Sequence, residues 1–345
     1  MKRTTTLILL AFLFAISVVL ALHIATPKKA NLKHASFDRF FSPESLQLID
    51  TLNLNFNSYY FAGMDSTRLY LGNSTAFGHI VEINVENLRD TTYHKVSVND
   101  ILAHKAVRVR INPPYFYLTD GITPFIYRGN TRDWKATSYI DSIYFVHAVP
   151  ILDSSVALLG VNRDLENTFY KVTKGKSELD VFPELLEKQG NDGLFSTDGI
   201  LQYDKRTKRL IYVFFYRNQY LYMDTNFNLL YKGNTIDSIT QVKIKVDEIS
   251  SENKITMSSP PLMVNKNCHL TENLLYIHSN ILAKNEDIDT FENSSVIDMY
   301  DLKNSSYKFS FYIPAYKENK MSEFIIEDNI IIARHGQYLV SYRLK

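Results

Sequence analysis

A short pattern recurs along most of the chain. An alternating hydrophobic run is followed by a turn rich in Gly, Asn or Asp, and then by a second run rich in Tyr and Phe. Alternation of this kind is typical of strands with one buried face, and two such runs around a tight turn predict a β-hairpin. The pattern occupies Arg68–Val85, Tyr115–Tyr127, Val156–Val172, Leu210–Tyr231, Leu274–Tyr300 and Phe324–Tyr342.

The spacing of these hairpins predicts the architecture. They begin roughly 40 to 65 residues apart, which is typical of four-stranded propeller blades, because helical repeats are mostly shorter and follow a 3.6-residue period. We therefore expect an all-β fold, a single β-propeller of six or seven four-stranded blades over residues 48–345. The run over residues 48–62 is expected to close the ring by pairing with the C-terminal strands, which would hide two sheet edges.

The segments between the hairpins predict few helices. Leu179–Gln189 has apolar spacing compatible with one short helix beginning near Pro183, and Asn99–Lys105 with a turn or two. Ser250–Lys266 and Lys284–Ser295 have little periodicity and are expected to be long loops on one face of the ring.

The N-terminus predicts a membrane segment. In Met1–Ala25, Lys2 and Arg3 precede about 19 residues without a formal charge, close to the length that spans a bilayer. A cleaved signal peptide and a retained anchor over residues 7–25 both fit this pattern. The positive-inside rule then places the folded domain in the periplasm or another extracytoplasmic space, with the anchor, if retained, in the inner membrane.

Residues 26–47 are expected to be a linker between the membrane segment and the domain, since they are mixed in character and show no sustained period. Phe37, Phe40 and Phe41 are the exception, and we expect them to form a short turn that docks on the domain. No cysteine lies near the end of the apolar stretch, so a lipid-modified N-terminus is excluded.

Composition narrows the function further. The chain has 345 residues, of which 45% are hydrophobic, enough for a large core. Its 38 basic and 37 acidic residues leave a formal charge of +1, so no global field favours nucleic acid. Cys268 is the only cysteine, which excludes an intramolecular disulfide.

Motifs that carry chemistry are missing from the sequence. No histidine pair has the spacing of a helical zinc site, and no nucleophile elbow, phosphate-binding loop or dinucleotide fingerprint occurs. The acidic stretch Asn285–Asp289 lacks the Gly and Glu of an EF-hand calcium loop. We therefore predict no catalytic, metal-binding or cofactor-binding residues and no cofactor. The nine histidines are His23, His34, His79, His94, His104, His147, His269, His278 and His335.

Three side chains are weaker candidates for ligand contact. Trp134 lies between charged neighbours and is expected to be partly exposed, with a ligand role as the minor interpretation. Arg108 and Arg110 are two apart on a strand and should face the same side. They could line a channel or hold a carboxylate, but a pair on the outer surface is the favoured interpretation.

Several short elements resemble a known superfamily. Arg68-Leu-Tyr-Leu-Gly72, Asp120-Gly121 and Tyr231-Lys-Gly-Asn234 together resemble the six-bladed propellers related to TolB and NHL repeats. The last element also echoes Tyr127-Arg-Gly-Asn130, as expected if the blades descend from one repeated unit. The Trp-Asp signature of WD40 repeats and the paired glycines of kelch repeats are missing. The resemblance implies an interaction platform in the periplasm or at the cell surface.

Three functions follow as hypotheses. The first is a membrane-tethered, non-enzymatic propeller that binds a protein partner of the cell envelope, or a small ligand, on its ring face. The second is an enzyme, such as a lyase or a quinone- or metal-dependent oxidoreductase, with two or three His, Asp or Arg side chains converging in the central channel. The third is a structural subunit of an envelope complex, recognisable by a broad exposed apolar patch.

Overall fold

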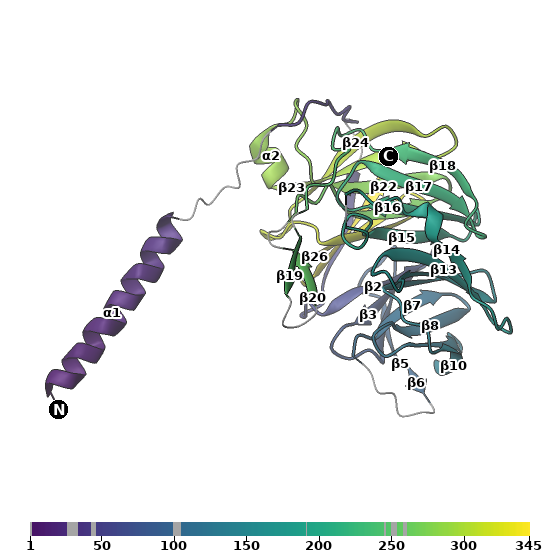
Figure 1. Ribbon diagram of the computed structural model, residues 1–345, viewed down its shortest axis with the longest axis horizontal. Coiled ribbons are helices and arrows are strands. Elements are labelled where there is room, and N and C mark those ends of the chain that lie inside the picture. Colours follow the sequence, from purple (N-terminus) through teal and green to yellow (C-terminus); the bar gives the residue numbers. More distant parts are fainter. Residues whose placement is uncertain are drawn as a thin grey trace. The chain divides into compact units, whose positions relative to one another are not determined.

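The computed structural model describes residues 2–25, 34–42, 46–98, 105–190, 192–244, 246–249, 254–257 and 261–345. The chain divides into two compact units, Met1–His34 and Ala35–Lys345. The first unit contains α1 (Lys2–Ala25), drawn in purple in Figure 1. Its segment Thr4–Ala21 has a mean hydropathy of 2.5 and no buried side chain, so it is long and apolar enough to cross a membrane. A signal peptide has the same properties.

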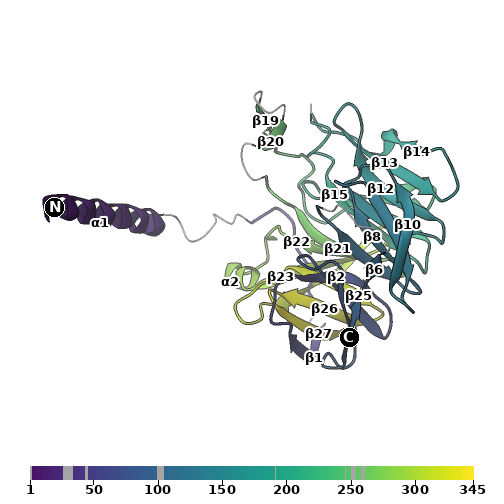
Figure 2. The same ribbon diagram turned by 90° about the horizontal axis from the view of Figure 1, so that it is seen from below.

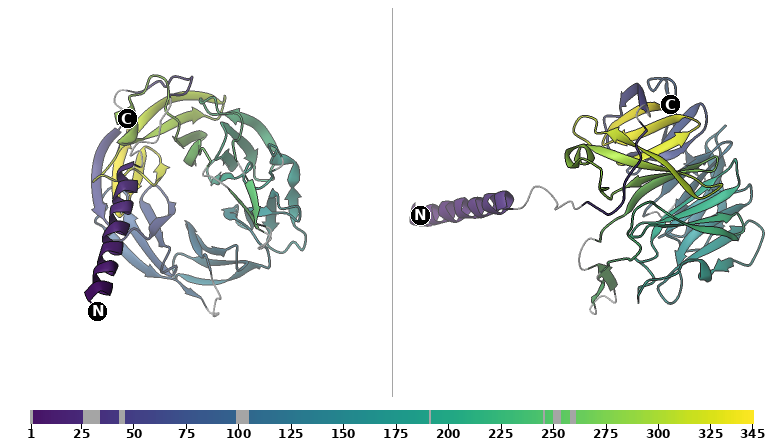
Figure 3. Two further views of the ribbon diagram at one scale, coloured as in Figure 1. Left: turned by 60° about the vertical axis from the view of Figure 1, so that its left-hand side comes forward. Right: turned by 90° about the horizontal axis from the view of Figure 1, so that it is seen from above.

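The second unit is a β-propeller of six blades, shown end-on in the left panel of Figure 3. Each blade has four antiparallel strands and is named below after its inner strand, which lines the centre of the ring. The first three blades, from inner to outer strand, are β2 (Tyr59–Met64), β3 (Arg68–Asn73), β4 (His79–Asn84), β5 (Thr91–Lys95); β7 (Arg108–Asn112), β8 (Tyr115–Asp120), β9 (Phe125–Asn130), β10 (Lys135–Asp141); and β11 (His147–Ile151), β12 (Ser155–Val161), β13 (Asn167–Thr173), β14 (Asp180–Phe182).

The other three blades complete the ring. From inner to outer strand they are β15 (Gly199–Asp204), β16 (Arg209–Phe214), β17 (Gln219–Asp224), β18 (Leu229–Asn234); β21 (Asn265–Thr271), β22 (Leu274–Ser279), β23 (Ser294–Asp301), β24 (Ser306–Pro314); and β25 (Glu323–Glu327), β26 (Ile330–His335), β27 (Tyr338–Leu344), β1 (Leu46–Asn53). The short β6 (Ser97–Val98) adds a parallel strand beside β10.

The ring closes as predicted, because β1 pairs antiparallel with β27 from Leu46 opposite Leu344 to Asn53 opposite Tyr338. The blade that joins the two ends thus takes one strand from the N-terminal side and three from the C-terminus. The single strand expected over residues 48–62 is two strands, since the chain turns after Asn53, with Asn55 at a φ of 63°, and enters β2 of the next blade.

Aromatic side chains fill the space between neighbouring blades, as the alternating pattern predicts. Between the β11 and β15 blades, Phe169 and Tyr212 are fully buried and meet edge to face, with ring centroids 5.0 Å apart. Flat, large side chains suit this position because two twisted sheets must be packed without voids.

The two faces of the ring differ in the length of their connections. Because each blade is an antiparallel meander, one face carries the turns between its first and second and between its third and fourth strands. We call this the turn face. The opposite face, here the loop face, carries the remaining turns and every connection between blades. The hairpin β19 (Val246–Ile249) and β20 (Lys254–Met257) and the helix α2 (Ile288–Glu292) belong to loop-face connections, on the same side of the ring in Figure 2.

Several expected elements differ from the structure. The helix predicted over Leu179–Gln189 is instead β14 followed by the single 3-10 turn Pro183–Leu185, because Val181 pairs with Tyr170 of β13 and continues the blade. The two expected loops are partly ordered: Ser250–Lys266 includes β20 and the start of β21, and Lys284–Ser295 includes α2, which Asp287 caps. Residues 99–104 of the predicted turn lie outside the described residues.

The shared Tyr-basic-Gly-Asn element is not a trace of a repeated unit. Its first copy lies in β9, a third strand, whereas its second copy lies in β18, a fourth strand. What the copies share is a glycine covered by an aromatic ring of the neighbouring strand. A Cβ at Gly129 would meet the ring of Phe116 at 2.3 Å, and a Cβ at Gly233 would meet the ring of Tyr220 at 2.1 Å. Packing therefore explains the similarity.

Part of the expected linker is docked on the β21 blade. Phe37 is buried, Phe41 stacks on Tyr312 with centroids 4.6 Å apart, and Phe40 is exposed, so only some of the predicted phenylalanine contacts form. The main anchor is Arg39, which the sequence did not mark. Its guanidinium pairs with Asp298 at 2.7 Å and with Glu286, and all three residues are buried.

Candidate functional site

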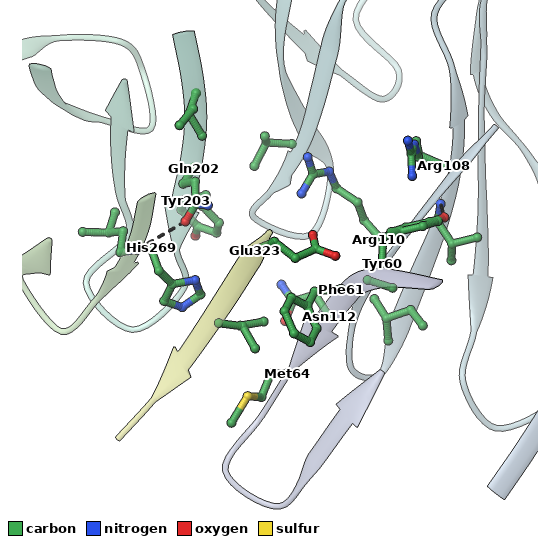
Figure 4. Close-up of a pocket in the computed structure, with 18 of the residues that line it drawn as sticks. Tyr60, Phe61, Met64, Arg108, Arg110, Asn112, Gln202, Tyr203, His269 and Glu323 are labelled. Atoms are coloured by element: carbon green, nitrogen blue, oxygen red, sulfur yellow. Dashed lines mark hydrogen bonds between the residues drawn. The ribbon is translucent and has the colours of Figure 1, made fainter. Parts of the chain in front are cut away.

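The six inner strands enclose a cavity of about 980 Å³ at the centre of the ring, which Figure 4 shows in close-up. All six strands contribute to its wall. The wall includes several charged or hydrogen-bonding side chains: Tyr60 of β2, Arg108 and Arg110 of β7, His147 of β11, His269 of β21 and Glu323 of β25. Every inner strand begins at the loop face, so Tyr60, Arg108, His147 and Glu323, at or near the starts of their strands, lie toward that end of the cavity.

Arg108 and Arg110 line this central cavity, so the favoured interpretation as an outer surface pair was wrong. They face the same side of β7, as their spacing predicted, with Val109 buried between them. The Arg108 guanidinium lies 4.4 Å from the ring centroid of Tyr60, whose hydroxyl accepts a hydrogen bond of 2.7 Å from the Val109 amide. Within the described part of the chain, the Arg110 guanidinium has no hydrogen bond or ion pair.

Two histidines in the cavity wall are held neutral. Burial, together with the positive charge of Arg110, lowers the pKa of His147 to about 4. Burial also lowers the pKa of His269 to about 4, although a backbone contact with Ile326 and the charge of Asp204 act in the opposite direction. Among the described residues, neither imidazole forms an ion pair with a carboxylate.

Other polar groups of the wall are already paired. The Glu323 carboxylate accepts a hydrogen bond of 2.6 Å from Nε of Arg334. Nη1 of the same arginine donates to the Gly336 carbonyl at 3.1 Å. The amide of Gln202 joins two inner strands, since it donates to the Cys268 carbonyl at 2.7 Å and accepts from the Leu270 amide at 3.3 Å. These hydrogen bonds hold the wall together and engage the same groups that a ligand would otherwise contact.

The turn-face end of the cavity is bridged by the connection between β15 and β16. Lys205 Nζ donates to the Pro113 carbonyl of the β7 blade at 3.1 Å. Its neighbour Arg206 pairs with Glu272 of the β21 blade and with Glu327 and Asp328 of the β25 blade, the last at 2.8 Å. One turn thus reaches three other blades across this end of the cavity.

The cavity is lined by both apolar and polar side chains. Phe61 and Tyr203 contribute apolar surface to the wall without filling the centre. Arg108, Arg110 and His147 lie toward the same end of the cavity, but among the described residues no hydrogen bond joins any two of these three side chains, so the enzyme hypothesis stays a prediction. Within those residues, no three His, Cys, Asp or Glu side chains are grouped closely enough to hold a metal ion.

Trp134 does not belong to this site. It is 7% exposed, has a positive φ of 54°, and its indole packs against the rings of His94 at 4.5 Å and Phe116 at 5.3 Å. The expectation of a partly exposed tryptophan was therefore wrong, and its role is in the core between the β2 and β7 blades.

Exposed large apolar side chains of the propeller are spread over several blades. They include Leu48 of β1, Tyr93 of β5, Val181 of β14 and Leu230 of β18. This distribution over the described surface favours no single broad patch, so the structural-subunit hypothesis stays a prediction.

No protein-family model matches the chain. No curated protein matches its sequence significantly either. Solved structures do resemble it. A DUF4221 family member from Bacteroides vulgatus has a TM-score of 0.53 at 13% identity, covering 88% of this chain and 99% of that one. A Bacteroides fragilis protein provisionally named as exported has a TM-score of 0.51 at 9% identity, with 91% and 99% covered.

A third similar structure is a catalytically inactive variant of virginiamycin B lyase from Staphylococcus aureus with quinupristin. Its TM-score is 0.50 at 11% identity, and 87% of this chain and all of that one (100%) are covered. Identities this low show a shared fold. They do not transfer the activities of those proteins to this chain. The chain therefore has the six-bladed β-propeller fold, while the finer resemblance to TolB and NHL propellers stays a prediction.

Proposed function

We propose that this protein is an exported, non-catalytic binding protein that holds a small molecule in the central cavity of its propeller, with access from the loop face. The observation that carries the proposal is the cavity itself. Its volume of about 980 Å³ lies within the range of small-molecule sites, and its wall mixes apolar surface with a few polar groups. The contacts of Lys205 and Arg206 across the turn face support entry from the other end.

Export is supported by α1, which is apolar over the length of a membrane span. The Bacteroides fragilis protein of the same fold, which is provisionally named as exported, is consistent with it. A retained α1 would tether the propeller to the inner membrane, and a cleaved one would release it. A protein partner in the cell envelope stays a prediction, and the loop face, with its longer connections, is where we would seek it.

The test is equilibrium dialysis of the full-length protein in detergent micelles against a mixed panel of neutral, cationic and anionic small molecules. We would compare the wild type with two variants. Met64→Trp places a bulky indole in the cavity wall at β2, and Val181→Trp places the same side chain on the exposed outer strand β14. We expect retention of at least one compound by the wild type and by Val181→Trp, and its loss in Met64→Trp. Equal retention by all three proteins would contradict the proposal.

A further inference from the structure

Arg110 carries a positive charge in the cavity wall and has no ion-pair partner among the described residues. Arg206, Arg334 and Arg39 each form an ion pair. Arg110 forms none within the described residues, although its side chain reaches into the cavity in Figure 4. Arginine cannot shed its proton in a protein, so this guanidinium stays charged. Its side chain is exposed to the cavity, so its N–H groups are accessible to an anion.

The groups around Arg110 do not supply that anion. The carboxylate of Glu323, the acidic side chain labelled in Figure 4, is taken by Arg334 at 2.6 Å. Arg108 adds a second positive charge from the same strand, lying over Tyr60 and likewise without a carboxylate partner among the described side chains. His147 is neutral and adds no negative charge. Arg108 and Arg110 thus place two positive charges side by side on one strand of the wall.

The shape and chemistry of the wall restrict the anion further. A single free guanidinium presents two parallel N–H groups, which match the two oxygens of a carboxylate. The apolar surface of Phe61 and Tyr203 suits an organic body attached to that carboxylate. A phosphate has more charge and more acceptors than one guanidinium satisfies, and the other guanidinium of this strand, that of Arg108, already lies over the Tyr60 ring.

We propose that the cavity recognises an organic acid by its carboxylate, which the Arg110 guanidinium binds while the aromatic wall holds the body. This inference rests on the proposed function and specifies its ligand class.

The test is fluorine NMR of the full-length protein in detergent micelles, titrated with 4-fluorophenylacetate, its neutral amide 4-fluorophenylacetamide, and 4-fluorophenyl phosphate. The variants are Arg110→Gln, which removes the charge; Arg132→Gln, an exposed arginine in the turn between β9 and β10, as the matched control; and Met64→Trp. Circular dichroism confirms that each variant is folded.

We expect the acid to bind more tightly than the amide. Arg110→Gln should weaken binding of the acid about 10- to 100-fold, as expected for the loss of a charge-assisted hydrogen bond. Arg132→Gln should change neither. The acid and the amide could instead bind with equal affinity, with binding unchanged in Arg110→Gln and lost in Met64→Trp. That result would overturn recognition of the carboxylate by Arg110 and would leave the proposed function standing. Tighter binding of the phosphate would also overturn it. Binding of no probe, or binding unaffected by Met64→Trp, would overturn the inference and count against the cavity as a site.

Discussion

Arg39 should contribute more to stability than any exposed arginine of the chain, although it lies in the segment that looks like a linker. Its guanidinium donates to both carboxylate oxygens of Asp298 at 2.7 and 3.0 Å, to the Ile281 carbonyl at 2.8 Å and to Ser279 Oγ at 2.8 Å, and it pairs with Glu286. Arg39 is 3% exposed and Asp298 is 2% exposed. The perturbation is Arg39→Met, which keeps most of the length and removes the charge.

The magnitude follows from what remains after the substitution. Two buried carboxylates would lose their cation, and removing one partner of a buried ion pair costs about 3–5 kcal/mol. Asp298 keeps a hydrogen bond from Ser310, and Glu286 keeps those from the Ala283 amide and the Tyr312 hydroxyl, both at 2.6 Å. We therefore expect a loss of about 3 kcal/mol in the free energy of unfolding, at the lower end of that range.

The assay is urea unfolding of the full-length protein in detergent micelles, followed by the fluorescence of Trp134, the single and buried tryptophan. Arg132→Met is the matched control and should change stability by less than about 0.5 kcal/mol. Adding Asp298→Asn to Arg39→Met should cost less than the sum of the two single changes, because the two residues share one network. A loss for Arg39→Met no larger than that of the control would refute the reasoning.

Two further predictions concern packing and proton binding. Gly233→Ala should destabilise the fold by about 1–3 kcal/mol, since its Cβ would overlap the ring of Tyr220, whereas Gly78→Ala, with its nearest neighbour at 3.4 Å, should be almost neutral in the same urea assay. The pKa of His147 is about 4 in the folded protein, below its ordinary value, so stability present above pH 6.5 is lost as the pH falls toward 4. Arg110→Gln should raise the pKa of His147 by at most about 1 pH unit, because burial is the larger of the two causes of the shift. The measurement is an NMR titration of the imidazole. A larger change in the pKa, or no change, would show that the two side chains are not placed as described.

The blades were predictable because their evidence is local. Alternation and turn residues mark each hairpin, and the spacing of hairpins indicates the propeller. Ring closure by the first strand followed from the need to cover sheet edges. The helix expected after Leu179 failed because strand pairing with β13 outweighed an apolar spacing that also fits a helix.

The cavity was not predictable in the same way. The spacing of Arg108 and Arg110 places them on one side of a strand, but which side faces the centre depends on the whole ring. His147 and His269 lie on different blades, so no spacing in the sequence connects them. Trp134 was expected to be exposed because of its charged neighbours, and its contacts with His94 and Phe116 come from strands that no local pattern in the sequence connects to it. Arg39 became visible only with its acidic partners, which lie more than 240 residues away along the chain.

The most direct test of the account is a spectrum of the methionine methyl groups, labelled with carbon-13, as 4-fluorophenylacetate is added. The chain has seven methionines, of which Met64 lines the cavity and Met223 is buried in the core between the β11 and β15 blades. If the cavity is the binding site, the Met64 resonance shifts with saturation and the Met223 resonance stays in place. A Met64 resonance that does not move at saturating probe, or one that moves less than that of Met223, would contradict the account.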